Sequence, residues 1–296
     1  RIERGFIIEV EAFDWNCPQH ITPRFSAAEV EALVENLRAE NRDLKIRLTK
    51  DNRISHNEEA PRPTSTAAPV ALGDGPLELV ITGVRQLTPR IRAYELRDPR
   101  GAQLPCVTAG SHLRVPARLA SGELVERYYS LASNPARRDI YEIAVQREEH
   151  GAGGSQAVHE TYAIGTTLRV DTPANHFQLH GDARPAILIA GGIGITAIKP
   201  MAQALDARGA DYRLHYAGRN RREMAFRDRL ERQLKDHMSV YSSEDGERLD
   251  IKDVLAQSPD DAVFYVCGPD RMINAALDSA RELGLPADRL RFERFT

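Results

Sequence analysis

The feature that most constrains the fold is a change of hydrophobic pattern near residue 184. Before it, from residue 77, short runs such as IYEIAVQRE and TLRVDTP are separated by turn-forming residues, which is typical of an antiparallel β-barrel or sandwich. After it, strands alternate with helical segments, and AILIA and AVFYVCG are almost wholly apolar, as expected for parallel strands covered on both faces. The pattern predicts an antiparallel β-barrel followed by an α/β domain with a parallel sheet.

The same patterns place the expected domain boundaries. We predict a β-barrel over residues 77–182 and an α/β domain over residues 183–296. Residues 51–76 are rich in Pro, Ser, Thr, Ala and charge, with few large apolar groups, and predict a flexible linker. Residues 1–25 begin with Arg and combine a strand-like run with a segment broken by two prolines. We expect them to be the tail of an upstream domain.

Residues 26–50 predict a helix with a repeat of its own. Ser26 and Glu29 have the spacing of a capping box, in which each side chain satisfies a free backbone amide. A heptad register follows, consisting of Val30, Val34, Leu37, Asn41, Leu44 and Leu48. This register favours a paired coiled coil, and hence a homodimer through the helix. An amphipathic helix lying on its own domain explains the residues equally well.

Composition argues against several classes of protein. The chain has 40 basic and 43 acidic residues, so it offers no strong field for nucleic acid or an anionic membrane. It has no apolar run of the roughly 20 residues that span a bilayer and no secretory signal at its start, so we expect a cytoplasmic protein. Cys17, Cys106 and Cys267 are far apart, and we predict neither a disulfide framework nor a metal site.

Two turns of the α/β pattern carry candidate nucleotide-binding residues. Three glycines lie between a buried strand and a helix: Gly191, Gly192 and Gly194. A bare backbone at the positive end of a helix can approach a pyrophosphate, although a tight turn without ligand is the alternative. The last apolar strand delivers Cys267, Gly268 and Pro269 to the carboxyl edge of the sheet, where ligands of open α/β sheets bind. Two such edges favour a dinucleotide site.

One β run of the barrel ends in ERYYSL. Alternation places Arg127 and Tyr129 on one face, with Tyr128 and Ser130 on the other. Such a strand could stack an aromatic ring and neutralise a phosphate, although an ordinary barrel strand with a surface arginine is the simpler alternative. Downstream, GAGGSQAVHETY predicts a glycine-rich loop and a short helix near Ser155, whose amides and hydroxyl form an anion cradle.

Taken in order, these segments resemble the ferredoxin reductase superfamily. The resemblance rests on RYYSLASNP, IAVQRE, GGSQAVHE and PANHF, followed by ILIAGGIGITAIKPM, HYAGRNRREMAF and VFYVCGPDRM. Within the superfamily it points to the phthalate dioxygenase reductase and vanillate demethylase reductase branch, and it covers about residues 76–296. Separately, IIEVEAFDWNCPQHITPRF is similar to the tail of pyridoxamine 5'-phosphate oxidase-like flavoproteins.

The resemblance implies a flavin in the barrel, FMN with FAD as the alternative. Arg127 and Ser155 would face its phosphate. Tyr129 would contact its ring, and Ser130 the reactive N5 edge. The resemblance assigns further residues to the flavin site: Tyr128, Ala144, Val145, Gly153 and Gly154.

For the α/β domain the resemblance implies NADH, with NADPH as the alternative. Residues along the pyrophosphate path would be Gly191, Gly192, Gly194 and Thr196, and those beside the nicotinamide Cys267, Gly268 and Pro269. Glu293 and Phe295 resemble residues that end the domain near the flavin, so with Ser130 and Cys267 they are the expected catalytic residues. Arg219 lies where the choice of dinucleotide is set, in AGRNRREM. That basic segment could hold a 2'-phosphate or simply be solvated.

The predicted function is therefore an NAD(P)H-dependent flavin reductase component. It would pass electrons from NADH through flavin to a [2Fe-2S] ferredoxin that serves a terminal oxygenase. The chain lacks the four-cysteine pattern of such a cluster, so a separate partner or a further domain is expected to hold it. One alternative is delivery to oxygen, haem or free flavin. Another is a non-catalytic coiled-coil interaction module on a degenerate flavin fold, against which Arg127, Ser130 and the glycines argue.

Overall fold

The computed structural model describes Glu35 and residues 71–295. The chain divides into two compact units, Arg1–Thr66 and Ala67–Thr296, and nearly all described residues belong to the second. The predictions for residues 1–25, and for the helix and linker that follow, fall almost entirely outside the described residues and stay predictions.

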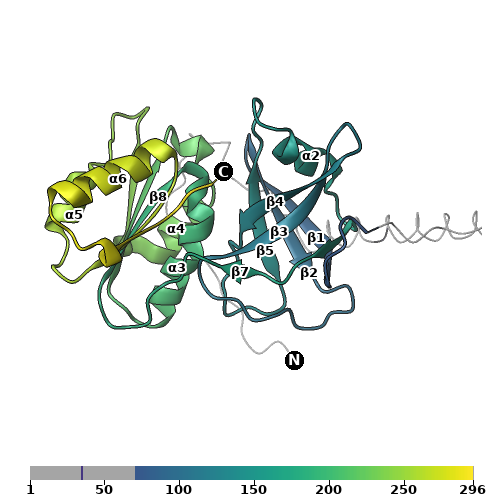
Figure 1. Ribbon diagram of the computed structural model, residues 1–296, viewed down its shortest axis with the longest axis horizontal. Coiled ribbons are helices and arrows are strands. Elements are labelled where there is room, and N and C mark those ends of the chain that lie inside the picture. Colours follow the sequence, from purple (N-terminus) through teal and green to yellow (C-terminus); the bar gives the residue numbers. More distant parts are fainter. Residues whose placement is uncertain (1–34, 36–70, 296) are drawn as a thin grey trace, which may run out of the picture. The chain divides into compact units, whose positions relative to one another are not determined.

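The first half of the described region is antiparallel β-structure (Figure 1). One sheet has the order β5-β2-β1-β6, and the other has the order β4-β3-β7. The strands and the one α-helix among them are β1 (Leu77–Thr88), β2 (Ile91–Arg97), β3 (Ser111–Arg118), β4 (Leu124–Ser130), β5 (Tyr141–Gln146), α2 (Gly154–Thr161), β6 (Thr167–Val170) and β7 (Ala174–Asn175). Alternate residues of both sheets, such as Ile81, Tyr94 and Val115, bury one shared core.

The second half is a parallel sheet with helices on both faces (Figure 1). Its strand order is β10-β9-β8-β11-β12. The elements are β8 (Ala186–Gly191), α3 (Ile195–Ala207), β9 (Tyr212–Gly218), α4 (Arg227–Leu234), β10 (Met238–Ser242), α5 (Ile251–Gln257), β11 (Val263–Cys267), α6 (Asp270–Glu282) and β12 (Leu290–Glu293). The predicted order, an antiparallel barrel and then a parallel α/β domain, is confirmed. None of the described helices is long and apolar enough to cross a membrane.

The sheet is apolar at its centre because both of its faces are covered. Every residue of β8 and of β11 is buried. Leu188 packs on the side of α3 and α4, whereas Ile187 and Ile189 pack with α5 and α6. The chain runs outward from β8 to β10 and then returns to β11, so the topological switch point lies between β8 and β11. Ligands of such sheets bind at the carboxyl ends of the strands beside this point.

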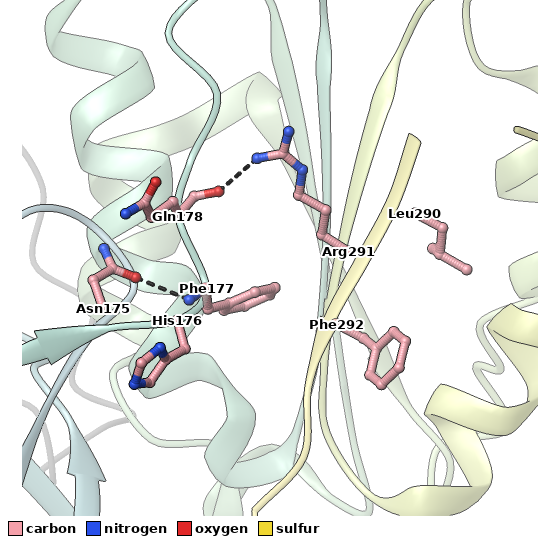
Figure 2. A pocket seen from close by; sticks show the side chains of 7 residues that line it. All are labelled: Asn175, His176, Phe177, Gln178, Leu290, Arg291 and Phe292. Atoms are coloured by element: carbon pink, nitrogen blue, oxygen red, sulfur yellow. Dashed lines mark hydrogen bonds between the residues drawn. The ribbon is translucent and has the colours of Figure 1, made fainter. Parts of the chain in front are cut away.

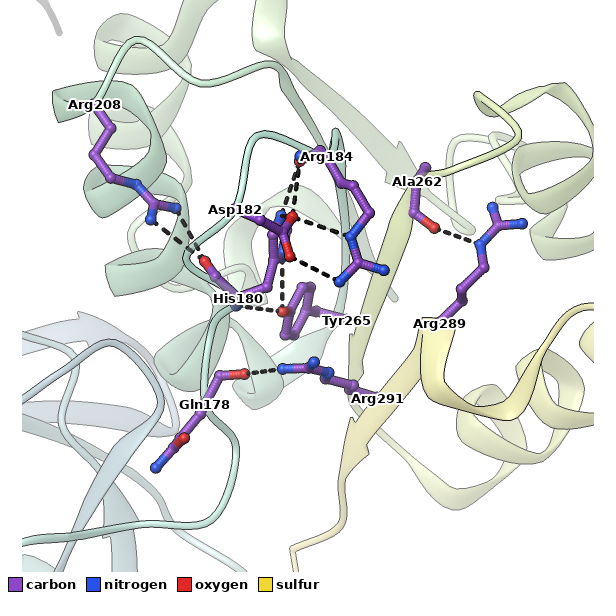
Figure 3. A network of polar contacts seen from close by, with 9 residues as sticks. All are labelled: Gln178, His180, Asp182, Arg184, Arg208, Ala262, Tyr265, Arg289 and Arg291. Carbon is purple, nitrogen blue, oxygen red and sulfur yellow. Dashed lines mark hydrogen bonds and ion pairs between the residues drawn. The ribbon is translucent and has the colours of Figure 1, made fainter.

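Residues 176–185 connect the two halves, and a polar network holds them against the sheet (Figure 3). The backbone amide of His180 donates to the Tyr265 hydroxyl over 2.7 Å, and the His180 ring lies 2.9 Å from the same oxygen. Arg291 of β12 donates to the Gln178 carbonyl over 2.9 Å. Hydrogen bonds from Arg184 lower the pKa of the Asp182 carboxyl to about 2. These contacts fix the path of the connection, and the sequence did not predict them.

A buried ionic cluster joins the α/β domain to the barrel. Lys199 of α3 is 2 % exposed and donates to the Ala132 carbonyl. Its Nζ lies 3.3 Å from Oε2 of Glu142 on β5, and Glu142 also pairs with Arg85 of β1. Burial lowers the pKa of the Lys199 amine, and the neighbouring Glu142 opposes this. The cluster therefore ties the helix after the glycine turn to the segment that follows β4.

Candidate functional site

Three residues predicted from distant parts of the sequence meet at the carboxyl edge of the parallel sheet. Ser130 ends β4, and its Oγ donates to Glu293 Oε2 over 3.3 Å. Glu293 ends β12 and pairs in register with Cys267, the last residue of β11. Ser130 is 3 % exposed and Cys267 is fully buried. The barrel and the α/β domain thus contact each other beside the switch point of the sheet.

Burial shifts the pKa values of Glu293 and Cys267 at this contact. It raises the pKa of Glu293 to about 7, and the hydrogen bond from Ser130 opposes the rise. Burial also raises the pKa of the Cys267 thiol, and the nearby Glu293 raises it further. Cys267 is therefore a neutral thiol rather than a nucleophile. The Glu293 carboxyl, in contrast, can gain or lose a proton near neutral pH.

The glycine turn after β8 packs tightly on one side and is open on the other. A Cβ on Gly194 would lie 2.1 Å from the Cys267 carbonyl oxygen, and one on Gly191 would lie 2.7 Å from Met272 Sδ. Gly192 has a φ of +54°, and nothing lies within 4 Å of where its Cβ would be. The Tyr216 hydroxyl donates to the Gly192 carbonyl over 3.2 Å. The turn therefore presents a fixed, bare stretch of backbone.

The start of α3 continues this open surface. The helix has no side-chain cap and no acidic residue in its first turn, so its positive end is not neutralised locally. Thr196 is buried, and its hydroxyl donates to the Ile193 carbonyl over 2.9 Å. Gly268 and Pro269 stand beside Gly191 at the neighbouring turn. The residues expected along the pyrophosphate path and beside the nicotinamide thus share one edge of the sheet.

A second anion cradle lies at the start of α2 in the barrel. Gly153 has a φ of +79°, and the helix has no side-chain cap and no acidic residue in its first turn. The Arg127 side chain lies against this turn, because a Cβ on Gly154 would come within 2.2 Å of Arg127 Nε. Ser155 Oγ accepts a hydrogen bond from the Glu148 amide over 3.0 Å. A guanidinium and free helix amides therefore face the same space.

The remaining predicted flavin residues differ in exposure. Tyr129 is partly buried, whereas Tyr128 is 61 % exposed and contacts the His112 ring at a centroid distance of 5.7 Å. Ala144 and Val145 are buried in β5. The Val145 carbonyl lies 2.8 Å from Nε2 of His159, so this backbone acceptor is already paired with the helix α2.

Phe295 and Arg219, the two remaining predicted site residues, are both exposed. Phe295 is 44 % exposed and is the last residue described. Arg219 is also exposed and follows β9, and its carbonyl accepts hydrogen bonds from Ser243 Oγ and the Glu244 amide. Neither side chain contacts Ser130, Cys267 or Glu293 through a hydrogen bond or ion pair among the described residues.

A cavity of about 350 Å³ lies next to this edge of the molecule (Figure 2). Its lining comes from the segment after β7 and from β12: Asn175, His176, Phe177, Gln178, Leu290, Arg291 and Phe292. Asn175 donates to the Ala109 carbonyl over 2.9 Å, and its Oδ1 accepts from the Phe177 amide. None of the predicted site residues lines this cavity. Its polar groups serve mainly to hold the connection.

The residues present fit a flavin and a dinucleotide. The cradle at α2 combines a guanidinium with unpaired helix amides, which suits a phosphate of a flavin nucleotide. The turn at Gly192 leaves open space above bare backbone at a helix start, which suits a pyrophosphate. Sequence reasoning missed Lys199 and Glu142, which connect the two domains, because no spacing rule links a buried helix lysine to a strand 57 residues away.

Comparisons with known proteins match both the barrel and the α/β domain. Residues 78–179 match the oxidoreductase FAD-binding domain, and residues 170–290 match the N-terminal domain of the dimethylamine monooxygenase subunit DmmA-like family. Tetrachlorobenzoquinone reductase of Sphingobium chlorophenolicum is 37% identical, over 74% of this chain and 67% of that protein. Vanillate O-demethylase oxidoreductase of Acinetobacter baylyi is 34% identical, over 74% of this chain and 68% of that protein.

Solved structures similar to this chain include proteins of the same kinds as these relatives. An intact type IV self-sufficient cytochrome P450 monooxygenase matches with a TM-score of 0.70 and 37% identity, over 82% of this chain and 32% of that one. Phthalate dioxygenase reductase matches with a TM-score of 0.67 and 32% identity, over 74% of this chain and 67% of that one. The chain thus spans about a third of the P450 protein and two thirds of the reductase. It belongs to the ferredoxin reductase superfamily of flavin-dependent oxidoreductases, in the branch of phthalate dioxygenase reductase and vanillate demethylase reductase.

Proposed function

We propose that this chain is the reductase component of an oxygenase system. It takes electrons from a reduced nicotinamide dinucleotide and passes them through a bound flavin to a [2Fe-2S] ferredoxin partner or domain. The observation that carries the proposal is the meeting of Ser130, Glu293 and Cys267 between two anion cradles that lie in different domains. Such an arrangement holds two nucleotides with their reacting ends together, which converts an encounter into a nearly unimolecular step.

The chain's own residues supply binding and geometry. Arg127 and the amides at the start of α2 hold the flavin phosphate, with Gly154 leaving room for the guanidinium. Tyr129 lies two residues along the same face of β4 and packs beside the ring. A bound flavin and nicotinamide supply hydride transfer and the later release of single electrons. We propose FMN, because α2 is the one helix start among the described barrel residues and would suit the single phosphate group of that nucleotide.

Ser130, Cys267 and Glu293 act at the reacting edge. Ser130 presents a hydroxyl whose partner, Glu293, changes protonation near neutral pH, so the pair can adjust its hydrogen bonding as charge develops nearby. Cys267 is a small, neutral, buried group that closes the floor of the nicotinamide site. Gly191, Gly192, Gly194 and Thr196 position the pyrophosphate, with Gly268 and Pro269 beside them. Phe295 covers the outer side of the site.

The proposed partner follows from the relatives and from the cysteine count. Among the relatives are carnitine monooxygenase reductase of Escherichia coli at 36% identity, and phthalate dioxygenase reductase, which transfers electrons from pyridine nucleotides to [2Fe-2S]. The chain has only three cysteines, fewer than such a cluster needs. A ferredoxin and a terminal oxygenase are therefore the proposed acceptors. A cytoplasmic location and a homodimer through residues 26–50 stay predictions.

A haem protein is the second candidate acceptor. The similarity to a self-sufficient cytochrome P450, at 37% identity and a TM-score of 0.70, favours it. The two candidates separate in one assay, in which the reduced protein is mixed with a plant-type ferredoxin or with a P450 haem domain. The acceptor whose spectrum changes faster at equal concentration is the one supported.

The proposal is tested by the absorbance of the purified protein reconstituted with flavin. We expect a yellow protein whose flavin band bleaches under anaerobic NADH or NADPH. Mass spectrometry of the extracted cofactor distinguishes FMN from FAD. A protein that retains neither flavin would contradict the reductase proposal and favour the non-catalytic alternative.

A further inference from the structure

A second cavity lies at the far end of the dinucleotide path. It has a volume of about 470 Å³ and opens where β9 and β10 end. Its lining consists of Pro89, Asn220, Arg221, Arg222, Glu223, Glu244 and Asp245. β9 directly follows the glycine-turn unit and is therefore the second strand of the nucleotide-binding unit. In such sheets the end of the second strand is where the adenosine ribose is recognised. The cavity is thus placed for the ribose and its 2' substituent.

Arg221, the central cation of this cavity, is already held by carboxylates. Its Nη2 lies 2.7 Å from Glu247 Oε2, and its Nε lies 3.3 Å from Asp245 Oδ2. Its Nη1 lies 3.8 Å from Glu231 Oε1. A guanidinium that shares its donors with three carboxylates has little capacity left for a phosphate. These contacts also tie the turn after β9 to the loop after β10.

The lining as a whole is acidic on balance. Glu223, Glu244 and Asp245 contribute three carboxylates, against the guanidiniums of Arg221 and Arg222. The side-chain oxygen of Asn220 is paired locally, because Oδ1 accepts from the Glu223 amide over 3.0 Å. A 2'-phosphate would enter this cavity against net negative charge, whereas a 2'-hydroxyl brings no charge and can donate to a carboxylate.

We propose that the carboxylates around Arg221 set the choice of dinucleotide. Asp245 and Glu247 hold the guanidinium away from the ligand and repel a 2'-phosphate, so the site takes NADH and discriminates against NADPH. This inference rests on the proposed function, because it concerns the dinucleotide that reduces the flavin. It also bears on the two alternatives that the sequence left open for AGRNRREM, a 2'-phosphate site or a solvated basic segment, and argues against the first.

The first test needs no variant. Binding of 5'-ADP and of 2',5'-ADP to the wild-type protein is measured by isothermal titration calorimetry. We expect 5'-ADP to bind at least tenfold more tightly than 2',5'-ADP. Equal or tighter binding of 2',5'-ADP would overturn the inference. Because these ligands carry no nicotinamide, the result does not depend on electron transfer.

The second test neutralises the two carboxylates, Asp245 and Glu247, that hold Arg221. The Asp245→Asn, Glu247→Gln double variant frees Arg221, so the ratio of kcat/KM for NADPH to that for NADH is expected to rise at least tenfold. Adding Arg221→Gln should abolish the gain, because the freed guanidinium is what binds the phosphate. Glu282→Gln is the matched control, since Glu282 forms an exposed ion pair with Lys252 and does not line the cavity.

The outcomes separate the two proposals. Flavin that bleaches equally well with NADH and NADPH in the wild type overturns the inference and leaves the reductase function intact. A double variant whose NADH-to-NADPH ratio stays within twofold of wild type also overturns it. Flavin that bleaches with neither dinucleotide overturns the proposed function itself.

Discussion

The two anion cradles are built differently. At the start of α2 a guanidinium, that of Arg127, lies against the first turn of the helix. At the start of α3 the glycine turn offers backbone alone, because the single lysine of that helix, Lys199, points into the barrel and donates to Ala132. One cradle therefore combines charge with helix amides, whereas the other uses helix amides and bare backbone.

This difference matches what each proposed ligand must do. A flavin stays bound over many turnovers, and charge-assisted bidentate hydrogen bonds to phosphate are roughly twice as strong as neutral ones. A dinucleotide must leave after each turnover, so a cradle of backbone amides that positions without a strong ion pair is the better choice. The comparison suggests that the barrel is built for retention and the parallel sheet for exchange.

The largest expected effect comes from removing the charge at α2. Arg127→Ala should weaken flavin binding about 100-fold, because a bidentate guanidinium–phosphate contact contributes about 3 kcal/mol. Arg127→Lys keeps the charge but loses the fork, so about tenfold weaker binding is expected. Fluorescence titration of the flavin-free protein measures both.

The control for this change is Arg114→Ala on the neighbouring strand β3. Arg114 forms ion pairs with Glu126 and Asp171 and does not contact the start of α2. It should leave flavin affinity unchanged. If Arg127→Ala retains flavin as tightly as Arg114→Ala does, the phosphate role of the α2 cradle is wrong.

The sequence predicted the architecture well because both halves follow simple periodic rules. The apolar runs AILIA and VFYVC are typical of strands covered on both faces, and both are fully buried in the sheet. The sequence also predicted that Ser130, Cys267 and Glu293 act together, although only through resemblance to a family. Spacing alone gives no reason to join residues 163 positions apart, such as Ser130 and Glu293.

The contacts that the sequence could not predict are those made by charged side chains in tertiary structure. Lys199 carries no signal in the sequence that sets it apart from a surface lysine, yet it is buried against Glu142. Arg221 lies in a basic segment that could hold a phosphate or be solvated, yet carboxylates from the loop after β10 and from α4 surround it. Both outcomes depend on which acid the fold brings close, and that information is absent from local pattern.

The second prediction sharpens the role of the backbone at α3. Gly194→Ala should lower the free energy of unfolding by about 2 kcal/mol, because its Cβ would overlap the Cys267 carbonyl and one of the two turns must move. Gly194 has a φ of −58°, so the cost is steric rather than conformational. Urea denaturation of the flavin-loaded protein measures it.

Gly192→Ala is the matched variant on the open side of the turn. Its φ of +54° costs about 1 kcal/mol for a residue with a Cβ, but the space there is empty in the protein. We expect a smaller loss of stability than for Gly194→Ala, with KM for the dinucleotide raised about tenfold as the methyl group displaces the pyrophosphate. Unchanged KM would place the dinucleotide elsewhere.

The smallest effect concerns Glu293, where the two cradles meet. Burial raises its pKa from 4.5 to about 7, so the folded state holds a proton that the unfolded state releases. Below pH 4.5 the carboxyl is protonated in both states and costs nothing. As the pH rises from 4.5 to about 7, the wild type loses stability, by about 1 kcal/mol when its partial exposure is allowed for.

Glu293→Gln removes this titration while keeping an acceptor for the Ser130 hydroxyl. Relative to the wild type, the variant should therefore gain stability as the pH rises through that window, in thermal unfolding series from pH 4.5 to 8. Glu282→Gln is the control: a hydrogen bond from Lys252 lowers the pKa of Glu282 from 4.5, so its stabilising contribution is lost only below this pH range, and the variant should follow the wild type throughout the series. If the stabilities of Glu293→Gln and wild type change in parallel over this range, the carboxyl is solvated. The barrel and the parallel sheet would then not close over it.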